Sequence, residues 1–182
     1  MVLRATGIIT RVAGTGTAGN SGDDGPATDA ELNVPTGVAV TASGGFLIAD
    51  TANNEVRAVS ATGIITRLAG TGTTGSSGDG GPASDAELFV PTGVAVTAGG
   101  GFLIAVVGQN VVRAVSAAGI ITRVAGTGTR GSSGDGGPAT DAELFAPTGV
   151  AVTADGGFLI ADCLNNEVRA VLDHLPPRPP RP

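Results

Sequence analysis

Three aspartates in glycine-rich loops are the first residues whose type and surroundings could support chemistry. Asp23, Asp79 and Asp135 each lie in an SGDxGPA segment, where carboxylate and backbone carbonyl oxygens could bind Ca²⁺. A calcium loop normally supplies several carboxylates at alternating positions, whereas most of these loops offer one. Because Asp-Gly pairs are also ordinary turn formers, we favour a structural turn and predict no metal and no cofactor.

A second set of polar residues surrounds a short loop between two apolar segments. Asp50 and Asp162 come directly before copies of this loop, and Arg57 and Arg169 follow them. We expect an Asp–Arg or Asp–backbone clamp at each of these corners, with binding of a partner as the alternative. The loop residues that could share in such binding are Asn53, Asn54, Asn165 and Asn166.

Cys163 and His174 are the remaining candidates for nucleophilic or acid–base catalysis. His174 is the only histidine, and it lies in an irregular proline-rich tail where no packing would position it. Cys163 takes a loop position that Thr51 and Val107 hold in the other copies, so we interpret it as an exposed thiol that arose by drift. The sequence therefore predicts no catalytic residue and no enzyme activity.

The overall composition argues against two kinds of partner. The 182 residues carry a formal charge of -6, and no apolar run is long enough to span a bilayer. Nucleic acids and anionic membranes both attract clustered basic residues, so we expect neither as a partner. No signal peptide is visible, and the sequence indicates no compartment.

A threefold repeat must build the elements that position these residues. GIIT begins at residues 7, 63 and 119, and GFLIA begins at 45, 101 and 157, always 56 residues apart. Residues 7–62 and 63–118 differ at only 13 positions, so a residue can be common to the copies by descent alone. Each repeat holds four short apolar stretches separated by turn signals such as Ser43-Gly44, and one long glycine-rich connection.

Four short strands per repeat predict an all-β fold, a β-propeller with four-stranded blades and three blades per chain. The GVAV stretch is wholly apolar, as expected for an inner strand that neighbouring blades cover on both faces. A stacked solenoid is the alternative, but four hairpin-linked strands per repeat fit it poorly. Within the long connection, DAELF is expected to form a helical turn capped by Asp85.

The string RVAGTGTRGSSGDGGPATDAELFAPTGVAV, followed by FLIAD and NNEVRAV, resembles the NHL-repeat proteins. The resemblance covers residues 7–171 and implies a six-bladed β-propeller. Some enzymes with that fold are metal-dependent lyases with histidine ligands, and no blade here carries a histidine. Thr41 and Gly45 stand where the family pattern has Asp and Asn, so the family's polar sites are not carried over to this chain.

The order of the predicted strands leaves one strand without a blade. Residues 7–14 would form the fourth strand of a blade that precedes the first, whereas the third blade (149–171) lacks its fourth strand. Three blades cannot close a ring, and an open ring exposes unpaired edges. We therefore predict a six-bladed homodimer in which Ile8 to Ala13 of each subunit completes the third blade of the other. The alternative is a fragment of a longer gene product.

Blade two departs from the other copies where Val106, Val107 and Val111 replace polar residues. These valines are interpreted either as neutral drift or as an apolar patch for a partner. Arg113 is expected to have lost its partner and to be solvated on an exposed strand. Residues 172–182 form a Pro/Arg-rich tail that we expect to be disordered, although PPRPPR matches a short pattern read by SH3-type domains.

The favoured function is a non-enzymatic propeller scaffold, assembled as a closed homodimer. The alternative is a module that binds a protein, peptide or glycan on the face with the long loops, where recognition usually occurs on a rigid scaffold. A metal-dependent lyase or hydrolase is the weakest hypothesis, because histidines and paired carboxylates are missing from the blades.

Overall fold

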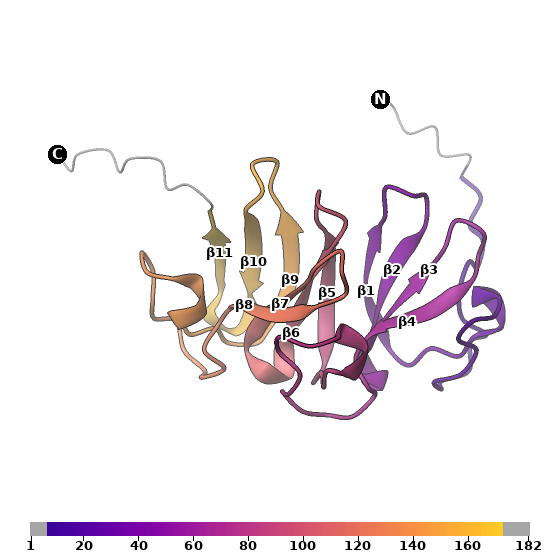
Figure 1. The fold of residues 1–182 in the computed structure, drawn as a ribbon, viewed down its shortest axis with the longest axis horizontal. Helices are drawn as coiled ribbons and strands as arrows, with labels where there is room; N and C mark the ends of the chain where they lie inside the picture. The colour runs from indigo at the N-terminus through magenta and orange to yellow at the C-terminus, as the bar shows by residue number, and fades with distance from the viewer. Residues whose placement is uncertain (1–6, 173–182) are drawn as a thin grey trace.

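A computed structural model describes residues 7–172, which form three antiparallel sheets (Figure 1). Blade one contains β1 (Pro35–Val40), β2 (Phe46–Asp50), β3 (Glu55–Val59) and β4 (Ile65–Ala69). Blade two contains β5 (Pro91–Val96), β6 (Phe102–Val106), β7 (Val111–Val115) and β8 (Ile121–Ala125). Blade three contains β9 (Pro147–Val152), β10 (Phe158–Asp162) and β11 (Glu167–Val171). The predicted all-β architecture is confirmed as a partial β-propeller with two four-stranded blades and one three-stranded blade.

The turns between strands follow from local sequence. Gly44 has a φ of 88° in the β1–β2 turn, a left-handed conformation that glycine adopts without steric cost. At the next corner Asn54 has a φ of 55°, which asparagine tolerates better than most residues. The flanking strands are rich in Val, Ile and Phe, which suit a pleated sheet buried on both faces.

Short 3₁₀ helices interrupt the connections, and no helix among residues 7–172 is long and apolar enough to cross a membrane. The predicted helical turn in DAELF is wrong in position, because the helix covers Ala83–Asp85 and follows Pro82, with no side-chain cap. These helices are η1 (Ala27–Asp29), η2 (Thr51–Asn53), η3 (Ala83–Asp85), η4 (Val107–Gln109), η5 (Ala139–Asp141) and η6 (Cys163–Asn165).

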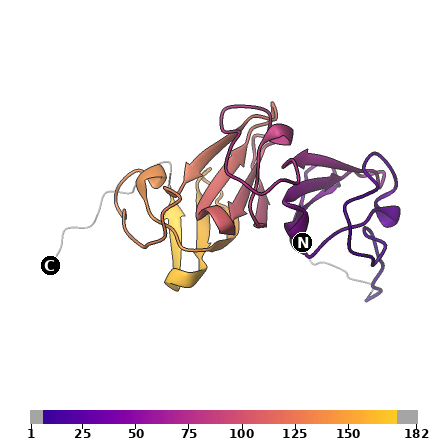
Figure 2. The same ribbon diagram turned by 90° about the horizontal axis from the view of Figure 1, so that it is seen from below.

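The three blades spread as a fan around their inner strands β1, β5 and β9 (Figures 1 and 2). The Thr36 hydroxyl donates to the Thr92 carbonyl oxygen at 3.0 Å, and Thr92 donates to Thr148 in the same way. Glycine is required where these strands cross, since a Cβ added at Gly93 would lie 2.6 Å from the Thr148 carbonyl oxygen. The inner strands therefore meet backbone to backbone.

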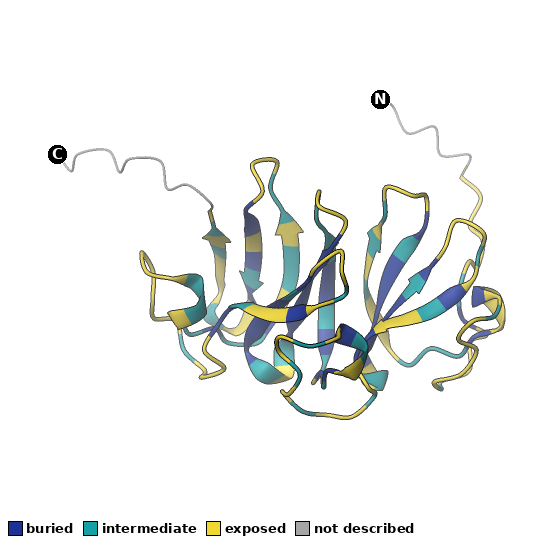
Figure 3. Cartoon of the chain, in the orientation of Figure 1, coloured by how far each residue is buried: buried dark blue, intermediate teal, exposed yellow. Residues whose placement is uncertain are grey.

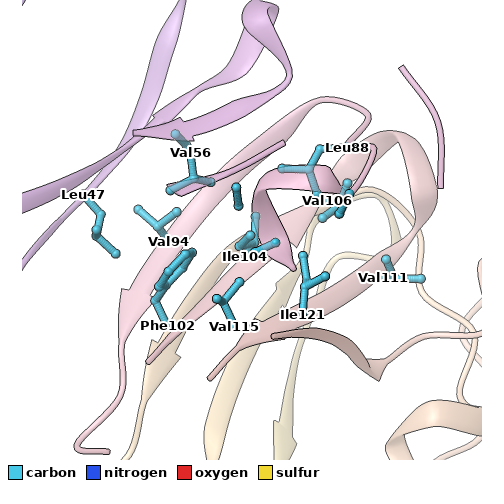
Figure 4. Packing of buried hydrophobic residues seen from close by; sticks show 14 residues of the cluster. Leu47, Val56, Leu88, Val94, Phe102, Ile104, Val106, Val111, Val115 and Ile121 are labelled. Carbon is cyan, nitrogen blue, oxygen red and sulfur yellow. The ribbon is translucent and has the colours of Figure 1, made fainter. Parts of the chain in front are cut away.

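Two of the three hydrophobic clusters lie between neighbouring blades (Figure 4), and the third lies between blade one and the connection that precedes it. Leu47 and Val56 of blade one pack toward Val94, Phe102 and Ile104 of blade two. A second cluster repeats this arrangement between blades two and three. The outward faces of blades one and three remain more exposed than the central blade (Figure 3).

The segment from Gly7 to Gly14 is not a strand in the single chain. The sequence predicts a strand there, and its counterparts in the other repeats, β4 and β8, do form strands because β3 and β7 lie beside them. Residues 7–14 have no such neighbour within residues 7–172. The predictions for the tail and for His174 concern residues outside those that the structure describes, apart from Leu172.

Candidate functional site

Each blade has an arginine at its corner, buried in blades one and two and partly exposed in blade three, and Arg57 represents the arrangement in blade one. Its Nε and Nη2 donate to Oδ1 of Asp23 at 3.0 and 2.7 Å, and Nη1 and Nη2 donate to the carbonyl oxygens of Glu31 and Ser21. Asp50 lies farther away, with its Oδ2 3.6 Å from Nη1. The predicted Asp50–Arg57 pair is therefore present, but Asp23 is the principal partner. This guanidinium fixes the long connection to the sheet.

The same arrangement recurs in the other two blades. Arg113 binds Oδ1 of Asp79, and Arg169 binds Oδ1 of Asp135, with closest distances of 2.7 and 2.6 Å. The expectation that Arg113 is solvated and without a partner is wrong, because its side chain is buried and makes four hydrogen bonds. Of the contacts that Arg57 makes, the departure of blade two from the repeat removes only the weaker aspartate contact, because Val106 stands at the position of Asp50.

Asp50 and Asp162 hold backbone and asparagine groups in place. Oδ1 of Asp50 accepts the Asn33 N–H at 2.7 Å, and its Oδ2 accepts from Nδ2 of Asn53 at 2.9 Å. Asp162 accepts from the backbone N–H at position 145 and from Asn165 with the same geometry. Burial raises the pKa of Asp50, although the Asn33 and Asn53 hydrogen bonds and Arg57 oppose this rise. These carboxylates are used structurally, and a binding role for them stays a prediction.

Asn54 links its blade to the next one. Its Oδ1 accepts the backbone N–H of Val90 at 3.0 Å, and Asn110 accepts from Ala146 in the same way. Asn166 is the third member of this series. It is exposed, because no further blade follows blade three among residues 7–172. Asn166, one of the two asparagines of blade three predicted to bind a partner, thus lies at the open end of the fan.

The apolar residues of blade two do not form a surface patch. Val106 is fully buried and Val111 nearly so, and both belong to the core between blades one and two. Only Val107 is partly exposed. Val106 and Val111 are therefore not available to a partner, because both pack inside the chain, and a binding role for Val107 stays a prediction.

The aspartates predicted as possible calcium ligands are separate from one another. No group of three or more His, Cys, Asp or Glu side chains lies together within residues 7–172. In each loop the Oδ1 atom of Asp23, Asp79 or Asp135 is already bound by an arginine. Their geometry is that of an ion pair at a turn.

The long loops and the tight turns lie on opposite faces of the fan (Figure 1). A groove of about 620 Å³ lies between blades one and two on the tight-turn face, lined by residues such as Leu47, Ile64, Leu68 and Phe102. The sequence instead favours the long-loop face for binding. Binding at that face stays a prediction.

The outer edge of blade three contains a second groove, of about 250 Å³. It lies beside β11, where β4 and β8 occupy the matching places in the other blades. Its wall includes Ala139, Ala142, Ile160 and Val171. Sequence reasoning had located this missing strand from the repeat order, but it had not identified the residues that would receive it.

Sequence reasoning missed the principal partner of each corner arginine. Asp23, Asp79 and Asp135 each precede an arginine by 34 residues. Because both members are present in all three copies, the fixed separation was the signal that could have paired them.

These sheets and corners define the class of the protein as a partial β-propeller. Residues 32–58 match the family model of the NHL repeat, which confirms the resemblance, and residues 88–114 and 144–170 are copies of the matched segment. No curated protein matches the chain.

Solved structures share the fold at low sequence identity. An auxiliary nutrient binding protein from Bacteroides ovatus is 22% identical with a TM-score of 0.65, covering 79% of this chain and 38% of its own. A protein of unknown function from Bacteroides thetaiotaomicron is 22% identical, with a TM-score of 0.63 and coverages of 70% and 32%. A putative phosphatase from the same species is 17% identical, with a TM-score of 0.60 and coverages of 74% and 34%. The chain therefore spans about a third of the length of these proteins.

Proposed function

We propose that the chain is a non-enzymatic β-propeller scaffold that becomes a closed six-bladed ring by pairing with a second copy. The observation that carries this proposal is the exposure of two matching blade faces. Val38 on blade one is 72% exposed, whereas its counterpart Val94 is 7% exposed. Val168 on blade three is 73% exposed, whereas its counterparts Val56 and Val112 are fully buried.

The two open faces are complementary by construction. The face of blade three that carries Leu159 and Val168 corresponds to the face of blade one that packs on blade two. The open face of blade one carries Val38 and Val40. It corresponds to the face of blade two that packs against blade one. A twofold axis would bring each open face against its complement twice, with no face left over. Burying exposed valines contributes about 25 cal/mol per Å² of apolar surface.

Polar groups at the same edges support the proposed pairing. Asn54 and Asn110 each accept a backbone N–H from the next blade, so in the proposed ring Asn166 would accept the N–H of Val34 from the second copy. In the same way, Thr148 would donate to the partner's Thr36, continuing the row of inner-strand contacts. The segment from Ile8 to Ala13 would complete blade three of the other subunit.

A structural use of the carboxylates supports the non-enzymatic part of the proposal. Asp50 and Asp162 are fully buried and hydrogen-bonded to backbone N–H groups and asparagines. The loop aspartates are bound by arginines. A general acid or base needs a carboxyl group free to reach a substrate proton.

A single glycine tests the ring. A Cβ added at Gly149 would meet only the Ala161 Cβ, at 3.5 Å, so Gly149→Ala should fold. In a closed ring that Cβ would overlap the carbonyl oxygen of the partner's Thr36, as the Gly93 Cβ would overlap Thr148. We expect a dimeric wild type, a monomeric Gly149→Ala variant and a dimeric Gly99→Ala control, because Gly99 faces open space. A monomeric wild type, measured by native mass spectrometry, would overturn the proposal.

A further inference from the structure

We propose that the outer edge of blade three is a peptide-binding groove that reads an isoleucine in an extended strand, and that its occupant is Gly7–Ala13 of a second copy. This inference rests on the proposed function and deepens it, because it names the bound segment, its register and the side chains that are recognised. A closed ring could also form through the blade faces alone, so the two proposals are separable.

The groove is lined by the same residue types that surround a buried isoleucine in blade one. In blade one Ile65 is fully buried against Ala27, Ala30, Ile48 and Val59. The groove of blade three is lined by the four corresponding residues, 112 positions later, but no isoleucine fills it. These four residues are Ala139, Ala142, Ile160 and Val171.

Backbone groups at the groove define the register of the missing strand. In blade two Gly80 N–H and Ala83 N–H donate to the carbonyl oxygens of Ile121 and Gly119, and Ile121 N–H donates to Gly81. Blade one repeats these three bonds. Within residues 7–172, the corresponding groups of blade three, on residues 136, 137 and 139, make no such bond. A strand added here would place Ile9 opposite Val171, as Ile65 lies opposite Val59.

The donor segment carries the side chain that the groove lacks. Ile9 is the counterpart of Ile65 and Ile121, and it is 96% exposed where they are 0% exposed. Gly14 N–H donates to the Ala27 carbonyl oxygen, as Gly70 N–H donates to Ala83, so the segment leaves blade one along the path that β4 and β8 follow. The segment lies at the blade-one end of the fan, and β11 lies at the opposite end (Figure 1). A second copy is therefore the occupant that the geometry favours.

A charged pair adds a second point of recognition. In blade one Nη1 of Arg67 lies 3.8 Å from Oε1 of Glu55. The corresponding residues are Arg11 of the donor segment and Glu167 of β11, which is exposed in the single chain. Strand addition supplies main-chain hydrogen bonds for affinity, and side-chain pockets supply specificity. The ligand class is thus an extended Gly-Ile-Ile-Thr-Arg peptide.

Peptide titration tests the groove separately from the ring. The protein is the full-length Ile9→Asp variant, whose own strand is disabled as a donor while its groove is intact. A fluorescently labelled peptide of residues 7–14 is titrated with it, and anisotropy is recorded. We expect saturable binding that Ile9→Asp in the peptide weakens by at least about tenfold, since the buried isoleucine contributes about 1.5–3 kcal/mol. Ile8→Asp in the peptide is the control, because the counterparts Ile64 and Ile120 are 37% exposed, and it should change affinity less than about threefold.

The peptide titration and the solution mass together distinguish failure of the groove from failure of the ring. Absence of saturable binding, or equal binding of the two substituted peptides, overturns the groove. A dimeric wild type with no peptide binding would mean that the ring closes through the blade faces, so the groove fails and the scaffold stands. A monomeric wild type that binds the peptide selectively would overturn the homodimer and the second copy as occupant, and would leave only the selectivity of the groove for this peptide.

Discussion

Arg113 donates two hydrogen bonds to Oδ1 of Asp79, at 2.7 and 3.0 Å, although 34 residues of chain separate them. The arginine side chain is 2% exposed and the aspartate side chain 44% exposed, so the pair joins a buried cation to the base of a surface loop. The carbonyl oxygens of Glu87 and Ser77 accept two further hydrogen bonds from the same guanidinium. This contact ties the long connection of blade two to its sheet.

Asp79→Ala should lower the free energy of unfolding by about 1–3 kcal/mol, because it leaves the buried Arg113 guanidinium with only backbone acceptors. Chemical denaturation measures the change. Asp141→Ala is the matched control, since Asp141 is exposed, and it should have almost no effect. Equal effects of the two substitutions would show that the pair does not stabilise the connection.

Val106→Asp should destabilise the protein by about 1–3 kcal/mol, because the carboxylate is buried beside Arg113 without the asparagine donor that Asp50 has. Adding Gln109→Asn supplies that donor, so the double variant should recover at least about 0.5 kcal/mol. A double-mutant cycle from urea unfolding measures the coupling. Additive effects of the two substitutions would contradict a corner built as in blade one.

Glu55→Val should stabilise the protein at neutral pH by about 1 kcal/mol. Glu55 is buried with its Oε2 unsatisfied, and blade two carries Val111 at the corresponding position. Burial raises the pKa of Glu55, so the folded state binds its proton more tightly than the unfolded state does. Stability therefore falls as the pH rises from the ordinary glutamate range through the raised pKa, and the gain from valine should be larger at pH 7 than at pH 4. Thermal unfolding at both pH values measures it, and an equal gain at both would contradict the assigned cause.

Addition of EDTA or of Ca²⁺ should leave the melting temperature nearly unchanged. The loop aspartates direct Oδ1 at arginine, which competes with a cation for the same oxygen. A bound ion at a hundredfold excess over its Kd would contribute about 2.7 kcal/mol. Differential scanning fluorimetry measures the shift, and a fall of several degrees in EDTA would restore the calcium interpretation of Asp23, Asp79 and Asp135.

The repeat allowed most of the fold to be predicted, because each strand lies between turn signals at a fixed separation. The strand predicted at residues 7–14 did not form because a strand needs a neighbour, and no strand lies beside this segment among residues 7–172. The helix over Ala83–Asp85 was misplaced because Pro82, rather than an aspartate cap, begins it.

The site was harder to predict because burial decides what a polar residue does. Arg113 was expected at the surface, since a strand sequence does not show that a loop 34 residues earlier folds over it. Val106 and Val111 were open to interpretation as a surface patch for the same reason, and the neighbouring blade covers them. The residues around Asp50 were predicted more accurately, because Asp50 and its asparagines lie in or beside the same short loop.

The solution mass of the unmodified chain tests ring closure most directly. Light scattering coupled to size exclusion should give about 35 kDa, twice the 17.5 kDa of one chain, because the proposed dimer would cover the open faces of blades one and three and fill the groove beside β11. A mass of 17.5 kDa that persists as the protein concentration rises would contradict the account.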